Sequence, residues 1–241
     1  MTNAILAAVA IEKSFGAVTA LSGVDLHVQA GERLGIIGPN GSGKTTLINC
    51  ITGVLRPDRG RIRFASKDIT ALPPHRRARL GIARTFQIPQ PFTGMTVLEN
   101  LLVPLDYLGR VPDRYHRADE VLRSVAIHGR RNDRSEALTQ VELRKLELAR
   151  ALVAGPQVLI ADEAMAGLSE GEIDEILQIL RDLNGGGVAV IMIEHIMHAV
   201  MRFSERIVCF EAGRIIAEGS PAAVANDPLV QRVYFGEQAR R

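Results

Sequence analysis

The sequence has few cysteines and almost no excess of charge of either sign. Its two cysteines, Cys50 and Cys209, lie far apart inside apolar stretches. Thiols placed in this way exclude a disulfide framework and favour reduced, structural cysteines in a cytosolic protein. Lys and Arg number 29 and Asp and Glu number 27, so no global field favours nucleic acid or an anionic membrane. We therefore expect no nucleic-acid partner.

Long hydrophobic runs are also missing. No stretch approaches the roughly 20 apolar residues that span a bilayer. The N-terminal run AILAAVAI is too short for a signal peptide and no Lys or Arg precedes it, so we interpret it as a strand. Without repeats or low-complexity tracts, the 241 residues predict one large domain or a core with a subdomain. We expect a soluble protein that can sit against a membrane protein.

Short apolar runs bounded by turn signals recur along the chain: RLGIIG, QVLIAD, VAVIMIE and RIVCFEAGRI. Such runs, separated by helical segments, are typical of a parallel sheet buried on both faces. Helices are predicted in TTLINCITGVL, EGEIDEILQILRDL and HIMHAVMRF, and antiparallel strands in SGVDLHVQAGERL and RGRIRFASKDI. The predicted fold class is α/β with an antiparallel β region near the N-terminus.

Residues 89–151 have a different pattern, with helical periodicity in VLENLLVPL and RYHRADEVLRSVAI. We interpret them as a helical subdomain inserted between two parts, 1–88 and 152–241, of an α/β core that binds nucleotide. The cluster HRRAR (75–79) and the pair Arg130–Arg131 are predicted to be solvated faces rather than binding patches.

A glycine-rich segment carries the most specific motif, G-x-x-x-x-G-K-[ST]. It follows the strand-like RLGII and opens a helix, which is the context that a phosphate loop requires. Its glycines let backbone N–H groups surround phosphates, Lys44 supplies charge to the β- and γ-oxygens, and Thr45 offers a hydroxyl to Mg²⁺. The residues are Gly38, Pro39, Asn40, Gly41, Ser42, Gly43, Lys44 and Thr45, with Thr46 next on the helix.

Two further strand ends carry the polar groups that a magnesium nucleotide needs. VLIADE ends in Asp162, placed to hold the metal, and Glu163, placed to polarise an attacking water. IMIEH ends in His195, and a histidine at the carboxyl end of a parallel strand faces the ligand crevice, where it can sense the γ-phosphate. The pattern predicts ATP hydrolysis.

Together these motifs resemble ATP-binding-cassette transporter ATPases over essentially the whole chain. RTFQ…MTVLENLLV, MAGL, IEHIMHAVM and QRVYFGE are most similar to the ATPase subunits of branched-chain or hydrophobic amino-acid uptake systems. The resemblance implies ATP and Mg²⁺ as cofactors. It also implies that Gln87 contacts metal and water, that Phe15 stacks on adenine, and that Ala166–Ser169 lies at a dimer contact. Ala164 replaces the proline that usually follows the glutamate, without loss of a donor or a charge.

The segment LTQVE (138–142) has two readings. Thr139 followed by Glu142 is a capping-box pattern, and a helix start also collects anions. The resemblance assigns it to the signature motif, usually LSGGQ or LSYGQ, which binds the partner subunit's ATP. Thr139 keeps the hydroxyl, but Val141 replaces a glycine and Glu142 an amide. We predict a capped helix start at a weakened phosphate site.

The resemblance implies an energy subunit at the cytoplasmic face of the membrane, with transmembrane permeases, a second ATPase subunit and, indirectly, an external solute-binding protein. Lipid or lipopolysaccharide export is the alternative within transport. A soluble cassette of DNA repair or translation lacks its usual coiled-coil arms, zinc ribbons or tandem cassettes here. A small-molecule kinase gives no reason for Gln87, AGLS or a signature helix.

Overall fold

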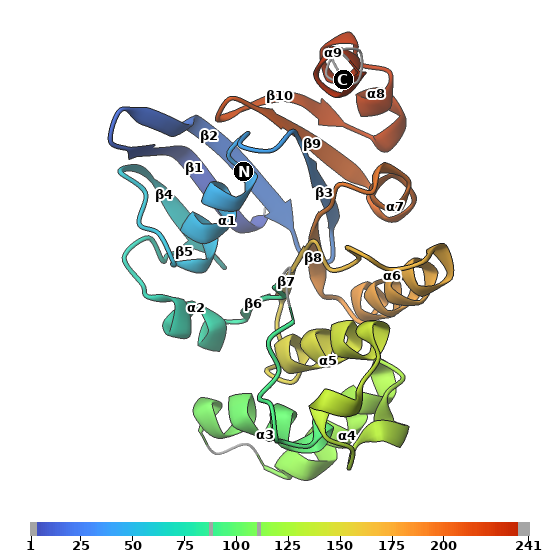
Figure 1. Cartoon of the computed structure of the whole chain (residues 1–241). Helices are drawn as coiled ribbons and strands as arrows, with labels where there is room; N and C mark the ends of the chain where they lie inside the picture. The colour runs from blue at the N-terminus through green and yellow to red at the C-terminus, as the bar shows by residue number, and fades with distance from the viewer. Residues whose placement is uncertain (1–3, 87–88, 110–111, 236–241) are drawn as a thin grey trace.

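Two β-sheets with helices packed on them form the described part of the chain (Figure 1). The computed structural model describes residues 4–86, 89–109 and 112–235. The smaller sheet is antiparallel, in the order β2-β1-β4-β5, and confirms the predicted N-terminal β region. Its strands are β1 (Ala4–Phe15), β2 (Val18–Gln29), β4 (Arg59–Phe64) and β5 (Lys67–Asp68).

The larger sheet has the strand order β10-β9-β3-β8-β7-β6, and its neighbours are parallel except for β10 beside β9. Its strands are β3 (Arg33–Ile37), β6 (Ile82–Arg84), β7 (Val158–Asp162), β8 (Ala189–Ile193), β9 (Arg206–Glu211) and β10 (Arg214–Gly219). The carboxyl ends of parallel strands meet at one edge of a sheet, where ligands bind. The loop after β3 and the acidic residues after β7 and β8 therefore lie at that edge.

Helices cover both sheets and extend the molecule at one end (Figure 1). They are α1 (Lys44–Thr52), α2 (Pro74–Leu80), α3 (Val97–Leu108), α4 (Arg114–Ser124), α5 (Gln140–Leu152), α6 (Glu170–Gly185), α7 (Met197–Phe203), α8 (Pro221–Ala225) and α9 (Pro228–Phe235), with 3₁₀ turns at His128–Arg130 and Ser135–Ala137.

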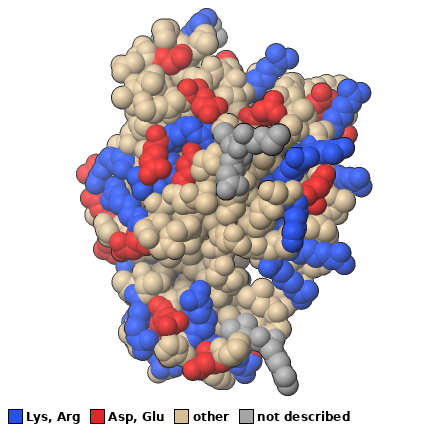
Figure 2. Space-filling model, turned by 180° about the vertical axis from the view of Figure 1, so that it is seen from behind, with Lys and Arg blue, Asp and Glu red and all other residues tan. Residues whose placement is uncertain are grey.

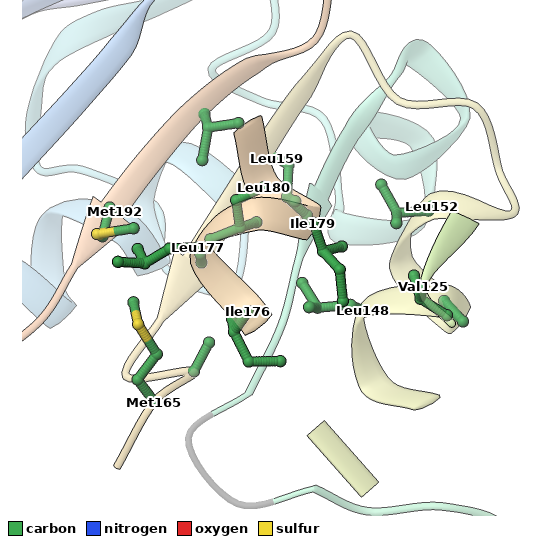
Figure 3. Packing of buried hydrophobic residues seen from close by; sticks show 14 of the residues in the cluster. Val125, Leu148, Leu152, Leu159, Met165, Ile176, Leu177, Ile179, Leu180 and Met192 are labelled. Atoms are coloured by element: carbon green, nitrogen blue, oxygen red, sulfur yellow. The ribbon is translucent and has the colours of Figure 1, made fainter. Parts of the chain in front are cut away.

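The central parallel strands β3, β7 and β8 are buried on both faces, and their side chains alternate between two hydrophobic clusters. On β8, Val190 and Met192 belong to one cluster and Ile191 to the other. Figure 3 shows the first cluster. It contains Met192 of β8 together with Leu177 of α6 and Leu148 of α5. The apolar runs of the sequence thus follow from helices on either side of the sheet.

Helices α3, α4 and α5 pack on one another beyond the parallel sheet (Figure 1). Leu101 of α3, Leu122 of α4 and Leu146 of α5 share the cluster that reaches β7 and β8. Because this cluster is common to the helices and the sheet, the limits of a subdomain at 89–151 stay a prediction.

The run RIVCFEAGRI, one of the apolar runs that predict a parallel sheet, covers β9 and the start of β10, and only β9 lies parallel to its inner neighbour. Ala212 and Gly213 adopt positive φ, 45° and 77°, and turn the chain back on itself. β9 continues the parallel sheet, whereas β10 pairs antiparallel with it. The apolar pattern does not distinguish these two pairings.

The HRRAR prediction is wrong for Arg77, which is 1% exposed. Its guanidinium donates to Cys50 O at 2.6 Å and Ile51 O at 2.7 Å, at the C-terminal end of α1. Carbonyls in the last turn of a helix carry its negative dipole end, and among the described residues only the Gly53 N–H also donates to Cys50 O, at 3.3 Å. Arg77 therefore caps the helix that begins in the phosphate loop.

The surface seen in Figure 2 carries Lys and Arg interspersed with Asp and Glu. Cys50 and Cys209 are buried and free, and burial raises the pKa of each thiol to about 11. Among the described residues, no helix is long and apolar enough to cross a bilayer.

Candidate active site

The loop 38–43 joins β3 to α1 at the carboxyl edge of the parallel sheet. Gly38 and Gly43 have φ of +151° and +108°, and a Cβ there would lie 2.4 Å from Phe210 O and 2.6 Å from Ala20 O. Glycine is needed at both positions, because an L side chain would be strained and would meet backbone. Gly41 faces open space. The loop is therefore a narrow backbone cradle that is open on one side.

Lys44 lies across this cradle. Its ammonium donates to Gly38 O at 2.6 Å and to Pro39 O at 2.9 Å. Burial lowers the pKa of Lys44, while the charges of Glu163 and Asp162 oppose the shift. The hydroxyl of Ser42 is buried without a hydrogen-bond partner among the described residues. A phosphate in the loop would offer oxygens to both groups, so the cradle fits a polyphosphate.

The two predicted carboxylates follow β7. Asp162 is the last residue of the strand, and Glu163 has φ of 48°, a left-handed conformation that is uncommon for a residue other than glycine. The Glu163 N–H donates to Ile193 O at 2.9 Å, which ties the turn to β8. His195 Nε2 lies 3.1 Å from Glu163 Oε1. Strained backbone held by its surroundings is typical of functional sites.

Two cavities gather the predicted residues. One, of about 140 Å³, is lined by Ala20, the loop residues 40–46, Glu163 and His195. The other, of about 600 Å³, is lined by Thr45, Asp162 and Glu163, together with Arg84, Phe86 and Arg150. The structure therefore brings the phosphate loop, both carboxylates and the histidine together.

The donor set fits Mg²⁺ only together with a nucleotide. Among the described residues, no group of three or more His, Cys, Asp or Glu could hold a metal. Thr45 and Asp162 nevertheless line one cavity with oxygen donors. Mg²⁺ commonly binds one or two carboxylates plus substrate phosphates and keeps several waters. The predicted pair Thr45 and Asp162 suits that mode.

Two predicted contacts remain outside this group. Gln87 lies outside the described residues, so its predicted roles toward metal and water stay a prediction. Phe15 ends β1, is half-exposed, and has the Lys13 ammonium 5.7 Å from its ring centre. An exposed aromatic at a hairpin end is free to stack on a base, but its role toward adenine also stays a prediction.

The capping box predicted in LTQVE is confirmed at the start of α5. Thr139 N donates to Glu142 Oε2 at 2.8 Å, and Glu142 N donates to Thr139 Oγ1 at 3.4 Å. The backbone hydrogen bond from Thr139 lowers the pKa of Glu142, so this carboxylate stays charged. Arg130 Nε lies 3.3 Å from Glu142 Oε1. Val141 packs against the hydrophobic cluster.

Three residues that the sequence analysis did not single out lie against the site. Arg84 contacts Asp162, Tyr234 of α9 accepts a hydrogen bond from Gly38 N, and Glu194 accepts one from Met165 N at 3.0 Å. Only Glu194 carried a local signal, as an acidic residue at a strand end beside His195. The contacts of Arg84 and Tyr234 join positions far apart in the sequence.

Glu194 is 2% exposed, and burial raises its pKa to about 7, with the charge of Glu163 adding to the shift. A carboxyl whose pKa is raised above its ordinary value of 4.5 stabilises the fold fully below that value. This contribution is lost as the pH rises through 7.

We expect the free energy of unfolding of the wild type to fall relative to that of Glu194→Gln by roughly 2 kcal/mol between about pH 5.5 and pH 8. The glutamine oxygen still accepts from Met165 N but does not titrate. Urea denaturation of both proteins at the two pH values measures the difference. Parallel pH dependences would contradict the assignment.

The phosphate cradle, the paired carboxylates and the parallel sheet define a nucleotide-binding ATPase of the phosphate-loop class. Residues 21–166 match the family described as ABC transporter, so the chain belongs to the ATP-binding-cassette transporter ATPases. Residues 214–240 match the model described as Branched-chain amino acid ATP-binding cassette transporter. The resemblance inferred from the motifs is thereby confirmed.

Relatives with two different names are similarly close. The chain is 37% identical over 241 residues to a probable branched-chain amino acid transport ATP-binding protein LivG of Archaeoglobus fulgidus, covering 95% of this chain and 94% of the relative. It is 37% identical over 236 residues to the lipopolysaccharide export system ATP-binding protein LptB of Haemophilus influenzae, covering 97% and 98%.

A solved structure described as the ADP conformation of an ATP-binding cassette of an ABC transporter has a TM-score of 0.90 to this one. It is 36% identical, and the match covers 98% of this chain and 100% of that one. The predicted fold class is confirmed.

Proposed function

We propose that this chain is the energy-coupling ATPase of an importer for branched-chain or other hydrophobic amino acids or related small carboxylates. The observation that carries the proposal is the match of residues 214–240 to the branched-chain amino acid cassette model. The relative named LivG supports it. The relative named LptB supports the second candidate, a lipid or lipopolysaccharide export ATPase. Both candidates act at the cytoplasmic face of a membrane.

In the proposed chemistry, the loop N–H groups and Lys44 bind the β- and γ-phosphates of ATP. Thr45 and Asp162 would hold Mg²⁺, with Gln87 as a further contact, and the bound ion would neutralise charge on the transferring phosphoryl group. Glu163 accepts a proton from the attacking water, and His195, 3.1 Å from its carboxylate, orients that carboxylate and faces the γ-phosphate.

Cassettes of this family work with permease subunits and dimerise. We propose a head-to-tail ATP sandwich in which Thr139 of one subunit reaches the ATP held by the other. The capping box occupies the Thr139 N–H and sets the charge of Glu142 close to that phosphate. The signature that this chain lends is therefore the weaker one, which favours a mixed dimer with a second, homologous ATPase.

A groove of about 270 Å³ between α2, α3 and β6 is the proposed seat of a permease helix. Val54, Phe86 and Tyr107 are exposed large hydrophobic residues on its walls. Cations stand against these rings: the Arg79 guanidinium lies 4.9 Å from the Tyr107 ring centre. An apolar groove rimmed by arginine is complementary to an amphipathic helix that carries acidic residues.

Tyr107→Ala should weaken association with the permease on the order of tenfold, because it removes an exposed aromatic anchor. ATP affinity should stay unchanged, since Tyr107 lines neither nucleotide cavity. Pull-down of the permease from native membranes with the tagged chain measures the effect. Tyr115→Ala is the matched control: Tyr115 is also half-exposed beneath an arginine, 5.2 Å from Arg114, but lies outside the groove. Equal loss from both variants contradicts the groove assignment.

The co-purified complex also tests the proposed function. A solute-binding screen of the receptor encoded with the permease should return branched-chain or other hydrophobic amino acids, or small carboxylates. A permease that extracts lipid or lipopolysaccharide, with no receptor for a small solute, would replace import by the second candidate.

A further inference from the structure

Arg84 links the metal carboxylate to a second cavity. It is the last residue of β6, the edge strand beside β7. One arm of its guanidinium, Nη2, donates to Asp162 Oδ2 at 2.6 Å, and the other, Nη1, donates to Asn49 Oδ1 at 2.7 Å. Asn49 belongs to α1, which opens at Lys44. Arg84 thus connects the helix of the phosphate loop with the strand that carries Asp162.

The pair is shielded from water. The side chains of Arg84 and Asp162 are 13% and 9% exposed, so their attraction is screened less than that of a surface pair. The Arg84 Nε is buried with no hydrogen-bond partner among the described residues, so the two terminal nitrogens hold the side chain. The guanidinium therefore neutralises the carboxylate proposed to hold Mg²⁺.

If a metal ion binds this carboxylate, the Arg84 guanidinium needs space into which it can be displaced. Arg84 lines the nucleotide cavity with Thr45 and Asp162, and it also lines the groove with Tyr107 and Ala78. The Phe86 ring centre lies 5.6 Å from the guanidinium, and Phe86 lines both cavities too. In the free chain, with no permease helix in the groove, the groove side offers space and an aromatic face for the guanidinium away from Asp162.

We propose that Arg84 is a built-in counter-cation of Asp162 that competes with the divalent metal for this carboxylate and so lowers metal affinity. The proposal rests on the proposed function, which gives Asp162 its metal. The alternative is a positioning role in which Arg84 only aims the carboxylate. The two differ in sign: without Arg84, a competitor model gives tighter metal binding and a positioning model gives weaker metal binding.

The test is a Mn²⁺ titration of the full chain with a non-hydrolysable ATP analogue, followed by electron paramagnetic resonance. Arg84→Gln keeps a donor for Asp162 but removes the positive charge, so Mn²⁺ should bind roughly tenfold more tightly. Arg84→Lys, which keeps the charge, should stay close to the wild type. Arg79→Gln is the control, since Arg79 also stands at the groove but does not contact Asp162.

Two further arms isolate the pair. In an Asp162→Asn background, Arg84→Gln should no longer change Mn²⁺ affinity, as a double-mutant cycle requires. Asn49→Ala releases the other arm of the guanidinium and should change Mn²⁺ affinity in the same direction as Arg84→Gln, which serves if Arg84→Gln does not fold. Weaker or unchanged Mn²⁺ binding in folded Arg84→Gln, or in Asn49→Ala where Arg84→Gln does not fold, overturns the proposal. Failure of the wild type to bind Mn²⁺ with the analogue would instead overturn the proposed function.

Discussion

Replacing Glu163 by glutamine is expected to lower ATP turnover by on the order of 10²–10⁴, because the proposed general base is lost. ATP binding should persist, since the loop and Lys44 are unchanged. In the wild type, His195 Nε2 lies 3.1 Å from Glu163 Oε1. Glutamine has the same size and keeps an oxygen within reach of this histidine. The left-handed backbone at this position, φ 48°, costs the same for both residues, so the variant should fold.

A phosphate-release assay measures the ATP turnover of the variant, and titration calorimetry measures its ATP affinity. Because unhydrolysed ATP persists, the variant should also favour the closed dimer, which light scattering detects. Glu120→Gln is the control, since Glu120 lies on α4 and lines neither nucleotide cavity. Turnover within a few-fold of the wild type in Glu163→Gln would remove Glu163 from the role of base.

The parts of the site that the sequence predicts are those whose geometry is local. The motif around Gly38 and Lys44 requires a strand, a tight turn and a helix start in direct succession, and the structure has β3, the loop and α1 in that order. The capping box of Thr139 and Glu142 spans four residues and is found as predicted. Hydrogen bonds between residues so close in the sequence are determined by the types of those residues and their spacing.

The residues that the sequence does not predict depend on partners far along the chain. Arg77 looks like one basic residue among several, but it is buried because carbonyls at the end of α1 lie beside it. The role of Arg84 cannot be predicted locally, because only the pairing of β6 with β7 brings it to Asp162. Such contacts depend on which strands are neighbours in the sheet, and no single segment of the sequence predicts that order.

Strand neighbours that the local pattern does not predict also explain why RIVCFEAGRI pairs in two different directions. Its apolar residues are consistent with either direction of neighbour, and the turn at Ala212 and Gly213 decides that β10 folds back on β9. Positive φ at Gly213 is easily reached by glycine, which is a turn signal in the sequence. Ala212 gives no such signal.

The second large effect concerns the two ATP sites of the proposed dimer. This chain completes its own phosphate site with its partner's signature and lends LTQVE to the other. At LTQVE the Thr139 N–H is bound by Glu142 Oε2, and the carboxylate stays charged near a polyanion. Arg130, 3.3 Å from Glu142, offsets part of that charge but does not free the N–H. The site that receives LTQVE should therefore contribute little turnover.

In a mixed dimer, Glu163→Gln in this chain should lower the turnover of the assembled complex by on the order of 10²–10⁴, because it disables the stronger site. The matching substitution in the partner should cost far less. Val141→Gly with Glu142→Gln should leave turnover intact or raise it, since it opens the backbone and removes the negative charge from the helix start. Steady-state ATPase assays of the three reconstituted complexes measure these outcomes. If the two glutamine substitutions cause equal losses, Thr139 and the helix dipole suffice for the phosphate, and the two sites are equivalent.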